Sequence, residues 1–256
     1  MRLGIAVNEW NFREQYRLAL EIVYEILLKP DNRLPDCFAK QLEKQDNSLL
    51  LRLHANPTKD YGEDIKRFQE LEEAIRNTKG SIEAVVLHPP KKISSRDEYI
   101  GNLAGFVSQM ANLQIRVLLE NGGLYKNETL SSPEETIEII HAVNELKMAF
   151  DLGKAFEYLL SKGLDSETAR RKIEELLLNH SGSIDEVHIC GKIQNYEGRA
   201  FKTTQLSDSM DALRPLDLNG LENQLIIVET NQQIEKLFEE VGYVKRRVRK
   251  RCRQLY

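Results

Sequence analysis

The chain has 256 residues, of which 41% are hydrophobic and 30% are charged, a composition typical of soluble globular proteins. No apolar run approaches the ~20 residues that a membrane-spanning helix needs. The N-terminus begins directly with a strand-like run, so we expect no signal or transit peptide. Cys37, Cys190 and Cys252 are too few and too far apart for a disulfide framework or a cysteine zinc site. They predict free thiols and a cytoplasmic location.

Charge is unevenly distributed along the chain. The whole chain carries a formal charge of −4 and residues 245–253 carry +7, so the remaining residues carry −11. An acidic body is a poor general surface for nucleic acid. The basic segment continues a helical stripe of apolar residues, which predicts the solvated face of a last helix. An anchor for nucleic acid or a membrane is the alternative interpretation.

Eight short runs rich in β-branched residues or leucine recur along the chain and predict strands. They are residues 3–7, 21–28, 48–54, 82–88, 115–120, 148–151, 185–190 and 225–229. Most of them end at an ionisable residue and are followed by residues typical of turns. This recurrence indicates a repeated unit of one strand and one helix.

Segments with apolar residues at helical spacing separate these runs. Helices are predicted at 11–20, 61–76, 97–112 and 133–145, on either side of Gly163 within 159–181, and within 231–256. Pro133, followed by two glutamates, is a favourable helix start because proline suits the first turn and acids suit the N-terminal dipole. The helix predicted at 11–20 is short, because few residues separate the first two predicted strands.

Strands that alternate with helices predict parallel pairing through right-handed crossovers. Near-continuous apolar strands predict a sheet that is covered on both faces. Eight such units match a (β/α)8 TIM barrel, and we expect a single barrel domain over residues 1–256. The alternative is a doubly wound open sheet, which predicts a glycine-rich phosphate turn after the first strand. Residues 7–10 do not form such a turn.

Six ionisable residues lie at or next to the C-terminal ends of six successive predicted strands. They are His54, His88, Glu120, Asp151, His188 and Glu229, separated by 34, 32, 31, 37 and 41 residues. A barrel brings these strand ends to one rim, where the active sites of this fold lie. Three imidazoles and three carboxylates are costly to bury unpaired, whereas a divalent metal binds both kinds of group. The pattern therefore predicts that these six residues form a metal site.

Each of the six residues also has a simpler interpretation when it is considered alone. A single histidine at a strand end is more often part of the core or rim, and a single carboxylate often caps the following helix. Independent caps have no reason to recur at every strand from the third to the eighth, so the whole set favours a metal site. His141 and His180 lie in helix or helix-end positions and are expected to be structural.

The motifs at these strand ends follow one another in a characteristic order. They are LHAN (53–56), LHPP (87–90), LLENGG (118–123), FDLGKA (150–155), VHICGK (187–192) and IIVET (226–230). This succession resembles the xylose-isomerase-like TIM-barrel superfamily, which contains the endonuclease IV type of AP endonuclease and many sugar isomerases and epimerases. The second strand, IVYEI (22–26), resembles the Glu-bearing strand of that group, at Glu25.

The resemblance implies two sets of metal ligands. Glu120, Asp151, His188 and Glu229 match the four ligands of the single Mn²⁺, Mg²⁺ or Zn²⁺ ion in the epimerase branch. His54 and His88 match the imidazoles that hold a second zinc in the endonuclease branch, with a bridging Glu at position 120. We therefore expect a divalent metal cofactor, zinc, manganese or magnesium, present as one or two ions.

The chain departs from the endonuclease pattern at the third zinc. That zinc is held by a histidine three residues after the sixth-strand aspartate, where this chain has Lys154. An ungapped alignment places Thr203 and Gln205 at the Asp-x-His pair after the seventh strand. Since all three ligands are replaced together, we interpret this as the loss of one metal. Our hypothesis is that the Lys154 ammonium occupies part of that space and offers a positive charge to an anionic substrate group.

Two chemistries suit this set of residues. The first, which we favour, is isomerisation or epimerisation of a sugar or sugar phosphate through a metal-bound enediolate, with Glu120 and Glu229 as the acid–base pair. The second is metal-dependent hydrolysis of a phosphodiester, in which Lys154 stabilises charge on the phosphorus oxygens. A non-catalytic barrel that serves as a binding scaffold is a third interpretation.

Cations near the rim bear on the choice of substrate. Lys192 and Arg199 are candidate substrate-binding residues that suit a phosphate or carboxylate group, and ordinary solvated loop charge is an equal alternative. The expected partner is a small sugar or phosphorylated molecule. Nucleic acid is a less favoured partner, and no membrane partner is expected. The sequence does not indicate an oligomeric state.

Overall fold

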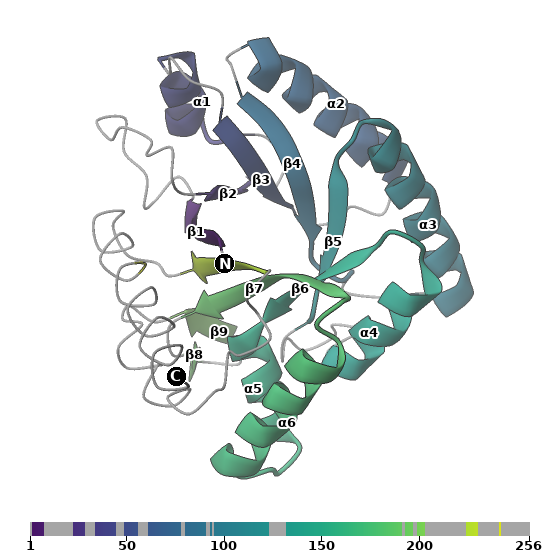
Figure 1. The fold of residues 1–256 in the computed structure, drawn as a ribbon, viewed down its shortest axis with the longest axis vertical. Helices are drawn as coiled ribbons and strands as arrows, with labels where there is room; N and C mark the ends of the chain where they lie inside the picture. The colour runs from purple at the N-terminus through teal and green to yellow at the C-terminus, as the bar shows by residue number, and fades with distance from the viewer. Residues whose placement is uncertain are drawn as a thin grey trace, which may run out of the picture.

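Eight parallel strands close into a barrel. The structure is a computed structural model, which describes residues 2–7, 23–28, 34–44, 49–55, 61–77, 80–90, 93, 95–122, 132–190, 193–196, 199–202, 224–229 and 241. The strand order is β1-β10-β7-β6-β5-β4-β3-β2, so the barrel strands follow one another around the barrel in chain order (Figure 1). The predicted (β/α)8 TIM barrel is confirmed.

All eight predicted strands are present near their expected positions. The barrel strands are β1 (Arg2–Val7), β2 (Val23–Leu27), β3 (Leu49–Ala55), β4 (Gly80–Leu87), β5 (Arg116–Glu120), β6 (Lys147–Asp151), β7 (Ile184–Cys190) and β10 (Leu225–Glu229). Pairing of β1 with both β10 and β2 closes the sheet. Between β7 and β10, the strands β8 (Ile193–Tyr196) and β9 (Arg199–Lys202) form an antiparallel hairpin that the sequence analysis did not predict.

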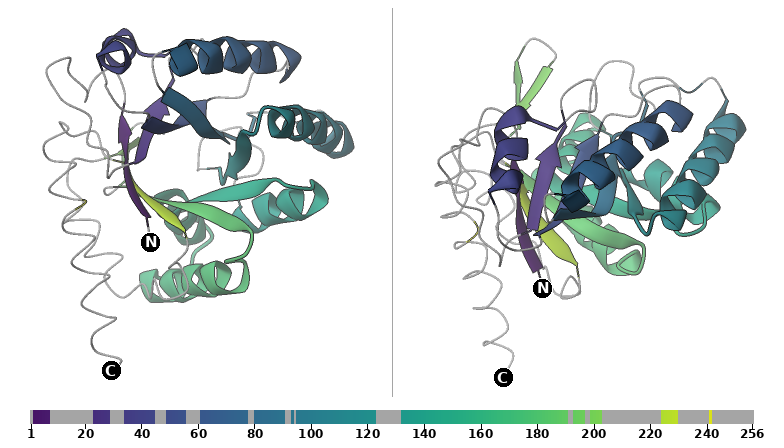
Figure 2. Two further views of the ribbon diagram at one scale, coloured as in Figure 1. Left: turned by 45° about the horizontal axis from the view of Figure 1, so that its top comes forward. Right: turned by 90° about the horizontal axis from the view of Figure 1, so that it is seen from above.

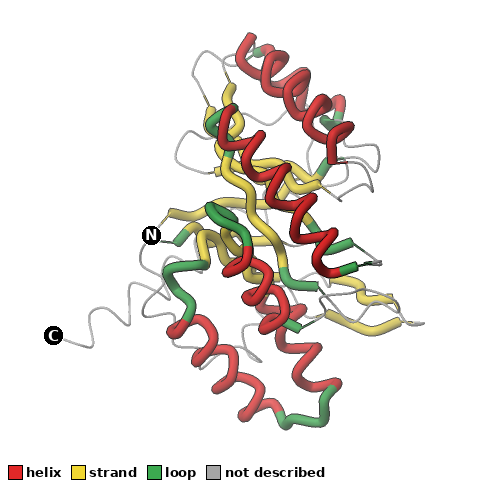
Figure 3. Tube along the Cα trace, turned by 90° about the vertical axis from the view of Figure 1, so that its right-hand side faces the viewer, coloured by secondary structure: helices red, strands yellow, loops and turns green. Residues whose placement is uncertain are grey.

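The described helices cover the outside of the barrel (Figures 2 and 3). They are α1 (Asp36–Glu43), α2 (Tyr61–Asn77), α3 (Arg96–Asn112), α4 (Pro133–Ala142), α5 (Leu152–Ser161) and α6 (Ser166–Asn179). The helices predicted at 61–76 and 97–112 are confirmed. The helix predicted at 133–145 is confirmed at its start, where Ser132 forms a capping box, but it ends early because Val143 is extended and Glu145 has φ of 63°.

The sixth unit contains two helices, as predicted. Gly163 has φ of 85°, a backbone conformation that ends α5 and that glycine adopts without strain. Asp165 then caps α6 through hydrogen bonds from the Glu167 and Thr168 amides, each 2.9 Å long. The helices predicted at 11–20 and within 231–256 lie outside the described residues, apart from Val241. None of the described helices has the length and apolar character needed to cross a membrane.

Two small clusters of side chains fill the middle of the barrel. One joins β4, β5 and β6, the other joins β1, β2 and β10, and both are separate from the main core between strands and helices. Their members are Ala84, Val86, Leu118 and Ala149, and Ala6, Val23, Leu225 and Ile227. Successive strand residues point to opposite faces, so the residue two positions later in each strand also points inward. This alternation aims the ionisable strand-end residues into the barrel mouth.

The opposite end of the barrel is closed by a charge network of three arginines and three acids. They are Arg2, Arg52 and Arg116, and Glu83, Asp185 and Glu186. The pairing register shifts by one residue at Glu83 in β4 and at Asp185 in β7. Such β-bulges redirect a side chain. Both bulged residues are acids of this network.

We expect Glu83→Gln to destabilise the protein by about 1–3 kcal/mol at pH 7. Burial raises the pKa of Glu83, but hydrogen bonds from Arg2 and the charges of Arg52 and Arg116 outweigh it and lower the pKa to about 2. Because the folded-state pKa lies below the unfolded value, the stabilisation is complete above about pH 4.5 and is lost as the pH falls through 2.

Urea unfolding between pH 7 and pH 2 measures this effect. The difference between wild type and Glu83→Gln should shrink towards the acid end, and a difference independent of pH would contradict the prediction. Glu138→Gln is the matched control, since Glu138 is 59% exposed in its ion pair with Arg96 and such pairs contribute about 0–1 kcal/mol.

Candidate metal centre

The barrel brings together the six ionisable residues that the sequence analysis singled out. Two sets drawn from these six residues have ligand atoms within 4.8 Å of one another. The first set is Glu120, Asp151, His188 and Glu229, and the second is His54, His88 and Glu120. Glu120, at the end of β5, belongs to both sets and is fully buried. The two sets therefore form one centre around a shared carboxylate.

Glu120 lies in contact with three imidazoles. Its Oε1 is 3.1 Å from His188 Nδ1, and its Oε2 is 2.8 Å from His88 Nδ1 and 3.5 Å from His54 Nε2. Burial raises the pKa of Glu120, but the charges of Lys154 and His54 and a hydrogen bond with His188 outweigh it and hold the pKa well below its usual range. The carboxylate is therefore ionised near neutral pH.

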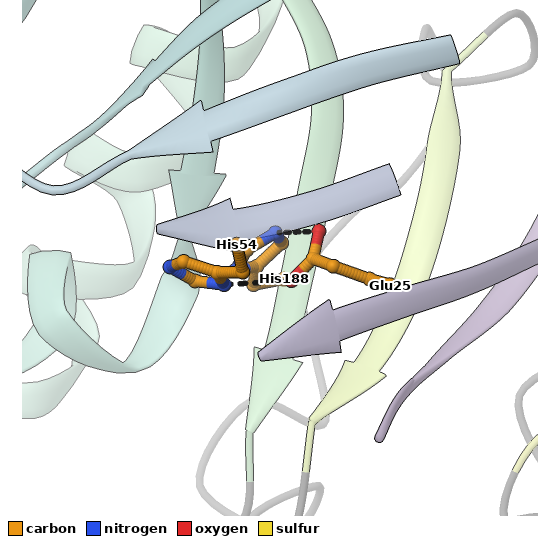
Figure 4. Close-up of side chains that lie close together, drawn as sticks. All are labelled: Glu25, His54 and His188. Atoms are coloured by element: carbon orange, nitrogen blue, oxygen red, sulfur yellow. Dashed lines mark hydrogen bonds and ion pairs between the residues drawn. The ribbon is translucent and has the colours of Figure 1, made fainter. Parts of the chain in front are cut away.

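Glu25, at the middle of β2, takes part in a third set of possible ligands, with His54 and His188. Figure 4 shows its carboxylate between the two imidazoles, with Oε1 2.7 Å from His54 Nδ1 and Oε2 3.3 Å from His188 Nε2. The sequence analysis noted Glu25 only as part of the resemblance and gave it no role. The sequence feature that could have identified Glu25 is the presence of an acidic residue inside an otherwise apolar strand.

Asp151 acts both as a helix cap and as a member of the centre. Its Oδ1 accepts a hydrogen bond of 2.9 Å from the Lys154 amide and so caps α5, while Oδ2 lies 3.8 Å from Lys154 Nζ. Asn121 supports this position from the end of β5. The Asn121 side chain accepts a 2.8 Å hydrogen bond from the Asp151 amide and donates one of 3.1 Å to the Asp151 carbonyl. The sequence analysis did not single out Asn121, which is part of the ENGG motif.

The Lys154 ammonium lies inside the centre and is almost fully buried. It contacts Glu120 Oε2, and it is 3.4 Å from His88 Nδ1. Burial and the charge of Lys154 together lower the pKa of His88 to about 4. The His88 imidazole is therefore neutral near pH 7 and has a lone pair available.

A divalent metal fits this centre. Glu25 Oε2 and His54 Nε2 are buried and make no hydrogen bond to any described residue, although each lies in an ionic contact, with His188 Nε2 at 3.3 Å and with Glu120 Oε2 at 3.5 Å. Burial lowers the pKa of His54, but the Glu25 and Glu120 carboxylates outweigh it and raise the pKa to about 9. The carboxylates therefore favour a positive charge at this point, which a bound cation also supplies. A mixed set of imidazole and carboxylate ligands suits Zn²⁺ or Mn²⁺.

The candidate substrate-binding residues lie at the edge of the described chain. Lys192 is outside the described residues, as are Thr203 and Gln205. Arg199 begins β9, in the hairpin that follows β7 at the mouth (Figure 2), but its side chain is not described. The two histidines expected to be structural, His141 and His180, lie outside the centre at the ends of α4 and α6.

Several solved structures share the fold of this chain, whereas no family model and no curated protein matches it. A D-tagatose 3-epimerase-like protein is similar with a TM-score of 0.63 and 16% identity over 100% of both chains. Endonuclease IV from Thermus thermophilus has a TM-score of 0.63 and 13% identity, covering 98% of this chain and 100% of its own. A xylose isomerase domain protein from Planctomyces limnophilus has a TM-score of 0.56 and 12% identity, covering 95% and 94%.

At these identities the likeness shows a shared fold. It extends over nearly the full length of each protein, and it includes proteins named for an epimerase and for an endonuclease. The resemblance drawn from the order of the strand-end motifs points to the same group. The chain therefore has a (β/α)8 TIM-barrel fold, which it shares with solved proteins that include a xylose isomerase domain protein.

Proposed function

We propose that this protein is a divalent-metal-dependent enzyme that isomerises or epimerises a sugar or sugar phosphate. The observation that carries the proposal is the buried set of three carboxylates and one imidazole, Glu120, Asp151, His188 and Glu229, at the C-terminal rim of the barrel. The likeness to an epimerase-like protein along the whole chain supports it. We also propose that one barrel domain accounts for residues 1–256.

These four residues would hold a divalent ion, which would supply Lewis-acid chemistry by polarising a substrate carbonyl and acidifying the neighbouring C–H bond. Glu120 and Glu229 are the proposed acid–base pair. They lie on β5 and β10, which are separated by β6 and β7 on one side of the barrel, so their carboxylates approach the centre from different directions. One carboxylate takes a proton from one face of the substrate carbon, and the other returns a proton to the opposite face.

Lys154 is the proposed site for an anionic substrate group or a developing oxyanion. A lysine at the rim end of α5 places a positive charge against Glu120 and beside His88. Lys192 and Arg199 are proposed to bind a phosphate or carboxylate of the same substrate. A charge that is already positioned in a buried site stabilises developing negative charge more strongly than it does in water.

A second candidate function is hydrolysis of a phosphodiester. It is favoured by the second set of ligands, His54, His88 and Glu120, which one-metal chemistry does not require, and by the likeness to endonuclease IV. Against it stand the acidic body of the chain and the lysine at position 154. A metal-free scaffold is the third candidate, which is supported if the purified protein holds no metal.

Metal content tests the centre directly. We expect purified protein to contain one or two equivalents of a divalent metal by mass spectrometry, because Lys154 stands where a third ion would need a ligand. Asp151→Asn should lower metal affinity by at least about 100-fold, since loss of a ligand costs more than loss of its outer partners. Three equivalents of zinc would contradict this assignment, and Glu138→Gln should retain wild-type metal content.

Parallel assays on ketose phosphates and on abasic-site DNA test the reaction class. We expect conversion of a sugar phosphate, with solvent deuterium incorporated at the reacting carbon because carboxylates exchange the proton. Rapid cleavage of abasic DNA without sugar conversion would instead establish the second candidate.

Replacement of the buried ammonium tests its role. Lys154→Met should lower kcat/KM by roughly 100-fold, the effect of removing one group that stabilises an oxyanion. Lys172→Met is the matched control, since Lys172 is 45% exposed and pairs with Glu134 on the outer surface. Unchanged kcat/KM in Lys154→Met would exclude Lys154 from the chemistry.

A further inference from the structure

A second carboxylate lies behind His188, on the side away from the proposed metal. Glu186 precedes His188 by two residues in β7, so both side chains point into the barrel in successive layers. His188 Nε2 is 2.5 Å from Glu186 Oε1, and both residues are fully buried. The other ring nitrogen, Nδ1, faces Glu120 Oε1 at 3.1 Å and Glu229 Oε2 at 3.5 Å.

Arg52 reaches Glu186 across the interior of the barrel. It lies on β3, which is separated from β7 by three strands in either direction around the barrel. Its Nη1 donates to Glu186 Oε2 at 2.5 Å, and its Nη2 donates to Asp185 Oδ2 at 3.0 Å. Its Nε contacts Glu83 Oε2 at 3.4 Å. The guanidinium is fully buried, so these three acids supply the charge that it needs.

We propose that Glu186, held by Arg52, is a positioning residue that keeps the proton of His188 on Nε2 and leaves the Nδ1 lone pair for the metal. The proposal rests on the metal centre of the proposed function. A ligand histidine whose other nitrogen donates to a carboxylate has a fixed tautomer and ring orientation. Arg52 keeps Glu186 in place as an acceptor, because a buried carboxylate without a cation would be costly.

The same contacts favour one position of the metal among the three sets of ligands. His54 Nδ1 is engaged by Glu25 at 2.7 Å, and His188 Nε2 is engaged by Glu186. In the set of Glu25, His54 and His188, the Glu25 carboxylate faces these two engaged nitrogens, His54 Nδ1 at 2.7 Å and His188 Nε2 at 3.3 Å. The nitrogens that remain, His54 Nε2 and His188 Nδ1, both face Glu120. These contacts favour a bound cation on the Glu120 side, where His54 and His188 would be its ligands and Glu25 and Glu186 their outer partners.

Glu186→Gln tests the proposal with little change in shape. The glutamine amide can accept from Arg52 with its oxygen and donate to His188 with its nitrogen, which moves the imidazole proton to Nδ1. We expect Zn²⁺ affinity, measured by competition with a chelator, to fall by about 10- to 100-fold. In Zn²⁺-loaded wild type, long-range ¹H–¹⁵N correlation spectra should show the His188 proton on Nε2, and Glu186→Gln should reduce the fraction of protein that shows this pattern.

Two further variants separate a positioning role from a merely structural one. Glu83→Gln removes a carboxylate from the same arginine network without touching His188, so it should lose stability but keep the wild-type Zn²⁺ affinity and tautomer. Arg52→Lys keeps the charge but loses the guanidinium hydrogen bonds that hold Glu186. It should weaken Zn²⁺ binding less than Glu186→Gln does. If Glu186→Gln does not fold, Glu186→Asp retains the charge next to Arg52 and should also bind Zn²⁺ more weakly than wild type.

The outcomes distinguish this proposal from the proposed function. Wild-type protein that binds no Zn²⁺ would overturn the metal centre and this proposal with it. Wild-type binding together with undiminished binding by Glu186→Gln or Glu186→Asp would overturn the positioning role alone. Equal loss of affinity in Glu83→Gln would also overturn it, because the effect would then follow from general weakening of the network.

Discussion

The Glu120 carboxylate is the group around which the barrel mouth is organised. It is fully buried and contacts the imidazoles of His54, His88 and His188 and the ammonium of Lys154. A carboxylate removed from water without such partners would be destabilised by several kcal/mol. The surrounding strand ends therefore supply nitrogen ligands and cations, and the same surroundings suit a divalent ion. The contacts that stabilise the buried Glu120 carboxylate therefore come from the same side chains that would bind the metal ion.

The barrel interior combines two apolar clusters with buried charged side chains that run from one end of the barrel to the other. Most barrels of this kind fill all interior layers with branched apolar side chains. Here Arg52 enters the lower layer, and its pairing partner on β4 is Ala84, a side chain small enough to leave room for a guanidinium. Glu186 contacts both Arg52 and His188, so that one chain of buried contacts joins the lower charge network to the mouth. The two ends are therefore not independent, since Arg52 and His54 on β3, and Glu186 and His188 on β7, are separated by two residues along the strand.

The local sequence predicted most of the fold because parallel strands buried on both faces are almost continuously apolar. It was less successful where the local signal is weak. The short helix α1 and the hairpin of β8 and β9 were not predicted, and α4 ends before its apolar pattern does because Val143 leaves the helical conformation. Asp151 shows why one residue supports two interpretations, since one of its oxygens caps α5 while the side chain also belongs to the centre.

The sequence by itself determined the barrel and the six ionisable residues at its mouth, because strand periodicity and position at a strand end are local properties. The tertiary structure alone decided which groups support them. Glu186 and Arg52 are separated by 134 residues, and Asn121 and Asp151 by 30. The local sequence around a single charged residue in a strand is the same whether its side chain faces solvent or extends across the core. Closure of the barrel brings such residues into contact, and so the partner of each buried charge is set by the fold.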